Sequence, residues 1–213
     1  MDALIHQQIQ QLSETRANIY WWFSTLYAST IDEEKLVTLL KDDDQNVLQT
    51  LCDNPSLTLI CKRFQRHIQP LLALEFPAQS LERDYIELFM PDSDTGTLPY
   101  ASIYHSEEPT LFQEPHFEML QRLEDVGLST QANFKEPADH LAIQLDYLGN
   151  VILQNIHQPS HASVQNQKHF IQCHLLNWLP AFLLRMKQVR NSGVYQSLTD
   201  LMIHYLQQDL RSL

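Results

Sequence analysis

Glycine is scarce in this chain. It occurs four times in 213 residues, at Gly96, Gly127, Gly149 and Gly193, whereas average usage is about 7%. No two of these glycines are closer than 22 positions. Motifs that need neighbouring glycines are therefore absent, which excludes a P-loop, a Rossmann dinucleotide fingerprint and a nucleophile elbow. Turn-rich β-sandwiches and β-barrels are also disfavoured.

Basic residues are also few. Lys and Arg number 14 against 26 Asp and Glu, so the formal net charge is −12. Sequence-independent binding to nucleic-acid phosphates needs the opposite sign, and we therefore expect no nucleic-acid partner. The acidic balance suits a basic partner, and it equally suits an ordinary cytosolic protein that must stay soluble.

Cysteines and long apolar runs are too few to support an extracellular or membrane protein. Cys52, Cys61 and Cys173 are odd in number and form no C-x-x-C pair, which argues against a disulfide framework or a zinc knuckle. The longest apolar stretches, such as residues 178–184, are too short to span a bilayer. Residues 1–11 contain no basic region followed by an apolar run. We therefore expect a cytoplasmic protein without membrane insertion.

Helical periodicity dominates the rest of the sequence. Apolar residues recur at steps of three and four from Ile5 to Leu26, interrupted only by Arg16, and similar stripes follow along the chain. Pro77 and Pro137 occupy positions typical of the first turn of a helix. The pattern predicts an all-α fold with about ten helices and no strand.

Two irregular segments divide this helical pattern. Residues 91–112 form a loop much longer than the usual four to six residues, and its apolar and aromatic residues indicate that it packs on the fold. Residues 128–135 are polar and aperiodic. They predict a hinge between an N-terminal part, 1–127, and a C-terminal part, 136–213. The residues assigned to this hinge region are Gly127, Leu128, Lys135 and Pro137, with Gly127 as a left-handed helix end.

No arrangement of residues in the sequence predicts catalysis or a metal site. The ten histidines lack metal-ligand spacing: His157 and His161 flank Pro159, and His169 and His174 lie on different helical faces. No nucleophile is fixed beside a base by local spacing. Because catalytic groups can assemble through space, a small helical enzyme stays an alternative, and a helical interaction scaffold is another.

Two segments combine apolar and acidic residues in a way that suits binding to a polypeptide. Glu82-x-x-Tyr85-x-x-Leu88-Phe89 places an apolar pair on one helical face, although a plain core stripe has the same pattern. Glu136-Pro137-x-Asp139-His140 places carboxylates at the predicted start of a helix, where the helix dipole favours them. An ordinary helix start would look the same.

Together with Pro99-Tyr100-x-Ser102-x-Tyr104, these two segments resemble, in order and approximate spacing, the motifs of the TorD/DmsD family of redox-enzyme maturation chaperones. The resemblance covers most of the chain and includes the aromatic cluster Tyr20-Trp21-Trp22-Phe23 of the first helix. Relatives often have tryptophan at the position of Tyr85. The resemblance implies an all-helical cytoplasmic chaperone without catalytic activity.

The family resemblance also implies partners, a cofactor and contact residues. The expected partners are an apo-molybdoenzyme, trimethylamine N-oxide reductase, and its twin-arginine signal peptide, with help in inserting the molybdenum cofactor before export. No cofactor is required, and GTP binding follows only from the family. The chain would occur as monomer and homodimer, and domain exchange would open at the hinge. The expected client contacts are Glu82, Tyr85, Leu88, Phe89, Pro99, Tyr100, Glu136, Asp139 and His140. His140 could tune binding near neutral pH or cap a helix.

Overall fold

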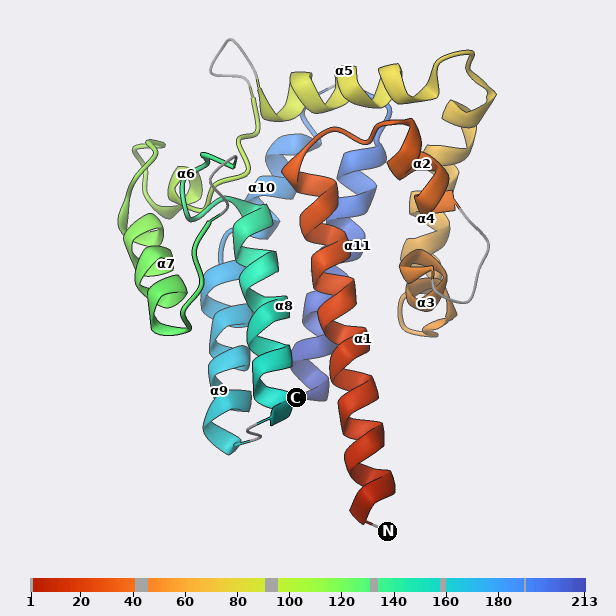
Figure 1. Cartoon of the computed structure of the whole chain (residues 1–213). Coiled ribbons are helices and arrows are strands. Elements are labelled where there is room, and N and C mark those ends of the chain that lie inside the picture. Colours follow the sequence, from red (N-terminus) through yellow and green to blue (C-terminus); the bar gives the residue numbers. More distant parts are fainter. Residues whose placement is uncertain (1, 41–45, 91–95, 131–133, 158–159, 190) are drawn as a thin grey trace. The chain divides into compact units, whose positions relative to one another are not determined.

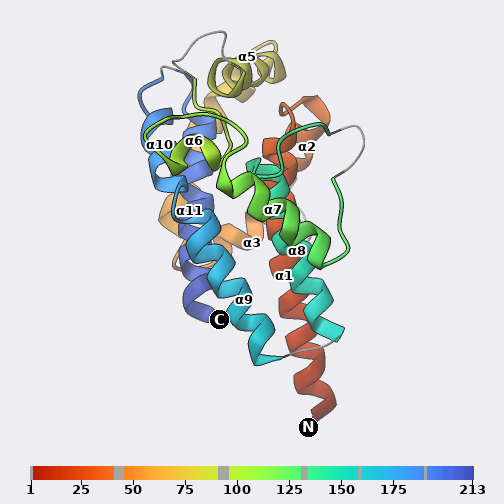
Figure 2. The same cartoon turned by 90° about the vertical axis from the view of Figure 1, so that its left-hand side faces the viewer.

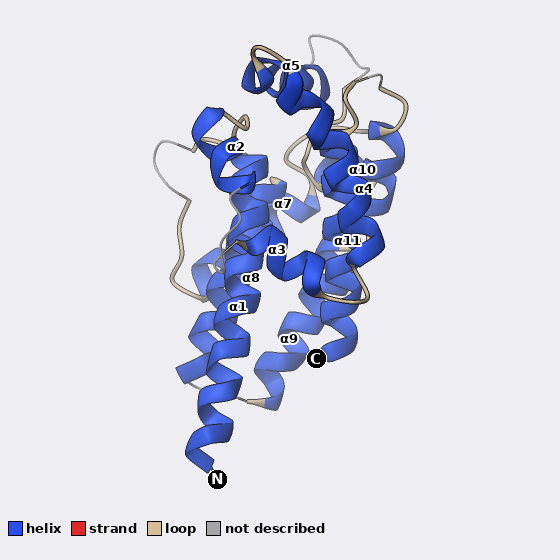
Figure 3. Ribbon diagram, turned by 90° about the vertical axis from the view of Figure 1, so that its right-hand side faces the viewer, coloured by secondary structure: helices blue, strands red, loops and turns tan. Residues whose placement is uncertain are grey.

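The computed structural model describes residues 2–40, 46–90, 96–130, 134–157, 160–189 and 191–213. Over these residues the secondary structure is helical, with eleven α-helices, one 3-10 segment and one π-helical segment, and no strand is drawn (Figure 3). The only isolated β-bridge in this part of the chain joins Tyr100 to His140. The predicted all-α fold with about ten helices is confirmed.

The chain divides into two compact units, and each takes segments from both halves of the sequence. Unit 1 comprises residues 1–28, 100–175 and 213, and unit 2 comprises residues 29–99 and 176–212. The predicted parts, 1–127 and 136–213, follow chain order instead. The hinge at 128–135 stays a prediction: residues 131–133 lie outside the described residues, and domain exchange is likewise untested.

Unit 1 is built on the pairing of α1 (Asp2–Ala28) with α8 (Leu141–His157), which lie side by side in Figures 1 and 2. The Trp21 side chain of α1 packs closely against Gly149 of α8, where an added Cβ would lie 2.6 Å from Nε1 of Trp21. The Ser24 hydroxyl donates to the carbonyl of Ala142 (2.8 Å). The remaining elements of unit 1 are α6 (Ser102–His105), α7 (Glu114–Asp125), α9 (His161–Phe170) and the π segment Ile171–Leu175.

Arg16, the residue that interrupts the apolar stripe of α1, reaches α9. Its Nη2 donates to Oε1 of Gln167 (3.1 Å), and Gln167 is buried. The polar interruption therefore marks a hydrogen bond between two helices of unit 1.

The two ends of the predicted hinge segment have well-defined local structure. Gly127 has φ +69°, so it is the left-handed end of α7 that the sequence predicted. The Leu128 N–H donates to the carbonyl of Leu123 (2.8 Å). At the other end, α8 begins at Leu141 rather than at Pro137, because Pro137 to His140 form a turn in which the His140 N–H donates to the Pro137 carbonyl (2.9 Å). The predicted helix start was four residues too early.

Unit 2 surrounds α11 (Val194–Ser212), which packs against α4 (Thr58–Ile68), α5 (Pro77–Phe89) and α10 (Leu179–Met186). An ion pair joins α4 to α11, with Arg63 Nη1 2.6 Å from Asp200 Oδ2. Helix α5 begins at Pro77, as predicted. The other elements of unit 2 are α2 (Glu33–Leu40), α3 (Val47–Asp53) and the 3-10 segment Gln69–Ala73.

A membrane-spanning helix would need a long apolar stretch. None of the helices over the described residues combines the necessary length and hydropathy.

Candidate functional site

The predicted contact residues belong to both units. Five of them lie in unit 2 and four in unit 1, and the chain passes from one unit to the other between Pro99 and Tyr100. We therefore describe two clusters. The unit 2 cluster comprises Glu82, Tyr85, Leu88, Phe89 and Pro99, and the unit 1 cluster comprises Tyr100, Glu136, Asp139 and His140.

The apolar members of the unit 2 cluster are core residues. Leu88 is fully buried and Tyr85 and Phe89 are nearly so. The Tyr85 and Phe89 rings meet edge to face with centroids 5.0 Å apart, and both contact the ring of Tyr195. Phe89 also stacks on Phe182 at 6.0 Å. This face of α5 therefore holds unit 2 together by packing aromatic side chains against α10 and α11.

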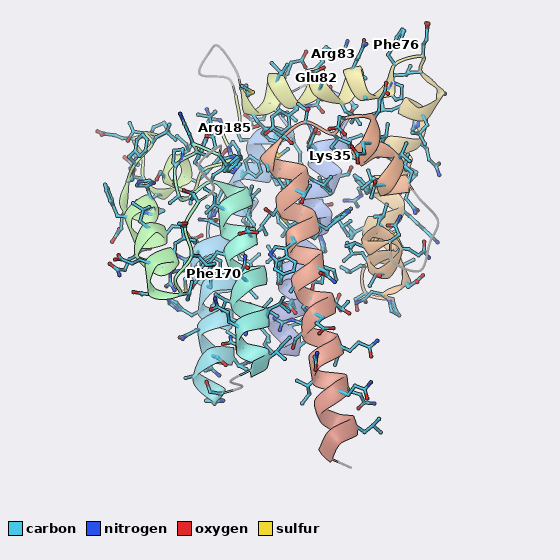
Figure 4. The ribbon with its side chains drawn as sticks, viewed as in Figure 1. Lys35, Phe76, Glu82, Arg83, Phe170 and Arg185 are labelled. Carbon is cyan, nitrogen blue, oxygen red and sulfur yellow. The ribbon has the colours of Figure 1, made fainter. Side chains whose placement is uncertain are left out.

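The segment that leads to Pro99 is fixed to the end of α5. The backbone N–H and the hydroxyl of Thr97 both donate to the carbonyl of Leu88, at 2.7 and 3.0 Å. Pro99 is buried, whereas Glu82 is exposed. Figure 4 shows Glu82 beside Arg83 on α5. Glu82 is the member of this cluster whose charged group reaches solvent.

Asp139 connects two segments of unit 1 that are far apart in sequence. Its Oδ2 accepts the backbone N–H of Ser102 (2.7 Å), and its carbonyl accepts the N–H of Ala101 (3.2 Å). The side chain is completely buried. A carboxylate that accepts a backbone N–H makes a strong, charge-assisted hydrogen bond. Asp139 therefore holds the start of α6 against the turn that precedes α8.

His140 caps α8. Its Nδ1 accepts the N–H of Ala142 (3.1 Å), and its carbonyl accepts the N–H of Gln144 (3.1 Å). The ring is buried, edge-on to Tyr100 at 5.0 Å and to Phe134 at 5.3 Å. Burial lowers the pKa of His140 to about 4, so the ring is neutral at pH 7. Of the two roles left open by the sequence, the structure shows the cap.

Tyr100 and Glu136 form the accessible side of the unit 1 cluster. The Tyr100 hydroxyl donates to Oε2 of Glu136 (2.6 Å), and Tyr100 also forms the β-bridge with His140. Glu136 is exposed and Tyr100 is half-buried. The E-P-x-D-H segment thus presents the Glu136 carboxylate at the surface, oriented by the Tyr100 hydroxyl. Asp139 and His140 of the same segment are buried.

Two residues that the sequence did not indicate support this cluster. His116 Nδ1 accepts the N–H of Ala138 (3.0 Å) and lies 3.8 Å from Oδ1 of Asp139. Gln113 donates its backbone N–H to the Ser102 hydroxyl (3.1 Å), and its side-chain amide donates to the carbonyls of Glu108 and Thr110. His116 is 22 residues away from Ala138 and Gln113 is 11 residues away from Ser102, so no local spacing reveals these two contacts.

Metal and nucleotide binding receive no further support. Among the described residues, no three His, Cys, Asp or Glu side chains gather closely enough to hold a metal ion. Binding of GTP stays a prediction, and so does the expectation that no cofactor is required.

The burial of Asp139 lets us predict how its substitution changes the stability of the protein. Asp139→Ala leaves the buried N–H of Ser102 without a partner, and we expect the free energy of unfolding to fall by about 1 to 3 kcal/mol. Asp139→Asn keeps an acceptor oxygen, so it should retain most of this stability. Urea denaturation followed by circular dichroism measures both variants. A variant Asp139→Asn that is as stable as the wild type but fails to bind a client would instead indicate direct contact by the carboxylate.

Comparison with known proteins gives matches along nearly the whole chain. The family model described as nitrate reductase delta subunit matches residues 53–183. A chaperone protein TorD from Vibrio parahaemolyticus is 36% identical over 207 residues, which cover 95% of this chain and 96% of that protein. TorD proteins from Photobacterium profundum and Ferrimonas balearica are 33% and 32% identical and cover 95% and 93% of this chain.

These matches confirm the predicted family, and with it the prediction of a chaperone rather than an enzyme. They span both structural units and all three motifs that carried the resemblance. The chain, similar to chaperones over its full fold and to the delta-subunit model over more than half its length, belongs to the TorD family of chaperones.

Proposed function

We propose that this protein is a system-specific chaperone of molybdoenzyme maturation whose client is trimethylamine N-oxide reductase. It would hold the apo form of the enzyme and its twin-arginine signal peptide in the cytoplasm, and assist cofactor insertion before export. The observation that carries the proposal is the chain-long similarity to relatives named chaperone protein TorD.

The accessible motif residues are the proposed contacts for the client. Glu82, Tyr100 and Glu136 reach the surface, whereas Tyr85, Leu88, Phe89, Pro99, Asp139 and His140 are buried and would position them. A twin-arginine signal peptide offers two arginines and an apolar run. The exposed carboxylates suit the arginines.

Charge alone is too weak to hold such a peptide. Micromolar binding needs about 8 kcal/mol, whereas an exposed ion pair contributes about 0.2 to 1 kcal/mol. Apolar contacts must therefore supply most of the binding free energy, and the carboxylates would orient the peptide and speed its encounter with the chaperone.

Isothermal titration of the full chain with the signal peptide of trimethylamine N-oxide reductase tests this function. We expect saturable binding that weakens when the two arginines of the peptide are replaced by glutamine. The double variant Glu82→Gln, Glu136→Gln should bind more slowly and with less dependence on salt. A matched control is Glu33→Gln, Glu34→Gln, which removes two exposed carboxylates from α2. If neither the peptide nor the whole apo-enzyme binds the wild type, the proposed function is wrong.

A further inference from the structure

Unit 1 exposes a group of large apolar side chains at the start of α7. Phe112 and Phe117 are 58% and 62% exposed, and Leu111 and Leu120 are 37% and 45% exposed. We call these four residues the Phe112–Phe117 surface; α7 is labelled in Figure 2. Exposed apolar groups that are contiguous and surrounded by polar residues commonly mark interaction sites.

This surface is held in place by the motif cluster of the same unit. The ring of His116 lies between the two phenylalanines, with centroids 5.0 Å from Phe112 and 5.2 Å from Phe117. His116 is itself fixed by the N–H of Ala138, beside Asp139. The exposed aromatic rings are therefore held next to the E-P-x-D-H segment, of which residues 137–140 are buried.

The backbone at Phe112 is unusual. Its φ is +60°, and it is the one non-glycine residue with a positive φ in the described part of the chain. This conformation is rare for a bulky residue. Gln113 holds the loop through three hydrogen bonds to Glu108 and Thr110, 2.7 to 3.1 Å long. Residues held in sparsely populated backbone conformations concentrate at functional sites.

The charged residues close in sequence to Phe112 and Phe117 are mostly acidic. Glu107, Glu108, Glu114 and Glu118 are exposed in the same segment, and no Lys or Arg occurs between Arg83 and Arg122. The only ionisable contacts of these carboxylates among the described residues are with histidines: His105 lies 3.2 Å from Glu114 and His174 lies 3.5 Å from Glu118. The surface thus combines aromatic contact area with an excess of carboxylates; the nearest Lys or Arg in the sequence, Arg122, lies one turn after Glu118 on α7, and its Nη2 is 2.8 Å from Nε2 of His174.

We propose that the Phe112–Phe117 surface binds the apolar, arginine-bearing segment of the client signal peptide. This inference rests on the proposed function. It assigns the apolar contacts that the peptide requires to the four residues of this surface. The phenylalanine rings would pack against the apolar run, and the surrounding glutamates would be further acceptors for the arginine guanidinium groups, in addition to Glu136 of the same unit. An acidic peptide of equal hydropathy would be repelled by the same carboxylates.

Exposed phenylalanines in the two units provide a matched comparison. The double variant Phe112→Ser, Phe117→Ser should bind the signal peptide at least about tenfold more weakly, as expected when central aromatic contacts are removed from an interface. The control Phe76→Ser changes a residue that is 53% exposed in unit 2 and labelled in Figure 4; its affinity should stay within about twofold of the wild type. Circular dichroism and thermal unfolding check that both variants keep the fold.

Photo-crosslinking reports contact directly. With p-benzoylphenylalanine in place of Phe117, the labelled signal peptide should crosslink to the protein, and it should not crosslink when the probe replaces Phe76. Replacing Glu107 and Glu108 by glutamine should reduce the salt dependence of peptide binding.

The outcomes separate this inference from the proposed function. If the peptide binds the wild type and the double variant equally, the inference is wrong and the proposed function stands. If only the whole apo-enzyme binds, the inference is also wrong. A double variant that changes the oligomeric state but not the peptide affinity would show that the surface joins copies of this chain, which again overturns the inference. Failure of both clients to bind overturns the proposed function itself.

Discussion

Replacing Leu88 by alanine should lower the free energy of unfolding by about 2 to 5 kcal/mol. Leu88 lies on the buried face of α5 and is completely inaccessible to solvent. The change removes most of an apolar side chain and leaves a cavity in the core of unit 2, where the surrounding side chains relax only partly. Because the Leu88 carbonyl also accepts two hydrogen bonds from Thr97, a shift of α5 would loosen the segment that leads to Pro99.

Ile86→Ala is the matched control for Leu88→Ala. Ile86 lies on the same helix but is 46% exposed, so its truncation should change the free energy of unfolding by less than about 0.5 kcal/mol. Urea denaturation at pH 7.5 compares both variants with the wild type. If Leu88→Ala keeps wild-type stability and yet loses signal-peptide binding, Leu88 contacts the client rather than the core.

The burial of Tyr85, Leu88 and Phe89 limits how their part in client binding can be tested. A loss of client binding in Leu88→Ala, Tyr85→Ala or Phe89→Ala follows from a weakened unit 2 as readily as from a lost contact. Only exposed residues separate the two causes. Glu82, Glu136 and the phenylalanines of the Phe112–Phe117 surface are therefore the informative positions.

The helical fold was predictable because its signals are local. Steps of three and four between apolar residues gave α1, and prolines or glycines gave the start of α5 and the end of α7. The start of α8 was placed too early because Pro137 is compatible with both a first helical turn and the tight turn that it actually forms. Helix α3 was missed, since seven residues give too few periods to be recognised.

The motif residues were predictable, but their roles were not. The sequence pattern marks Asp139 and His140 without indicating that one accepts the N–H of Ser102 and the other caps α8. Those roles depend on contacts between segments 37 residues apart. The Phe112–Phe117 surface was missed for a related reason: the same apolar spacing in α7 fits a buried stripe, and only the folded chain shows which members are exposed.

The neutral, buried ring of His140 should make the protein lose stability as the pH falls. Burial lowers the pKa of His140 from 6.5 to about 4 in the folded state, while the unfolded chain keeps the ordinary value. Between these two pH values the unfolded state binds a proton that the folded state does not, so acid favours unfolding. Each pH unit corresponds to about 1.4 kcal/mol. His140 should thus account for a loss of about 3 kcal/mol between pH 6.5 and pH 4, and its effect fades as the pH rises above 6.5.

A second histidine, His174, should also make the protein less stable as the pH falls. Burial, the Arg122 guanidinium and His169 lower the pKa of His174 to about 4. Its Nε2 lies 2.8 Å from Nη2 of Arg122, and since arginine can only donate, that nitrogen must accept. Protonation of His174 would break this hydrogen bond. His140 and His174 should therefore both contribute to the acid sensitivity of unit 1, and His140 is the more deeply buried of the two.

The variant His140→Asn isolates the contribution of His140. Asparagine keeps an oxygen that can cap α8 but does not titrate, so the variant should lose some stability at pH 7.5 and lose about 3 kcal/mol less than the wild type between pH 6.5 and pH 4. His161→Asn, at an exposed position on α9, is the control and should follow the wild-type curve. Urea denaturation at half-unit pH steps gives all three profiles. Parallel profiles for wild type and His140→Asn would mean that the buried ring takes up its proton without unfolding, and that Asp139 or Glu136, the carboxylates beside it in the motif, moves to accept the charge.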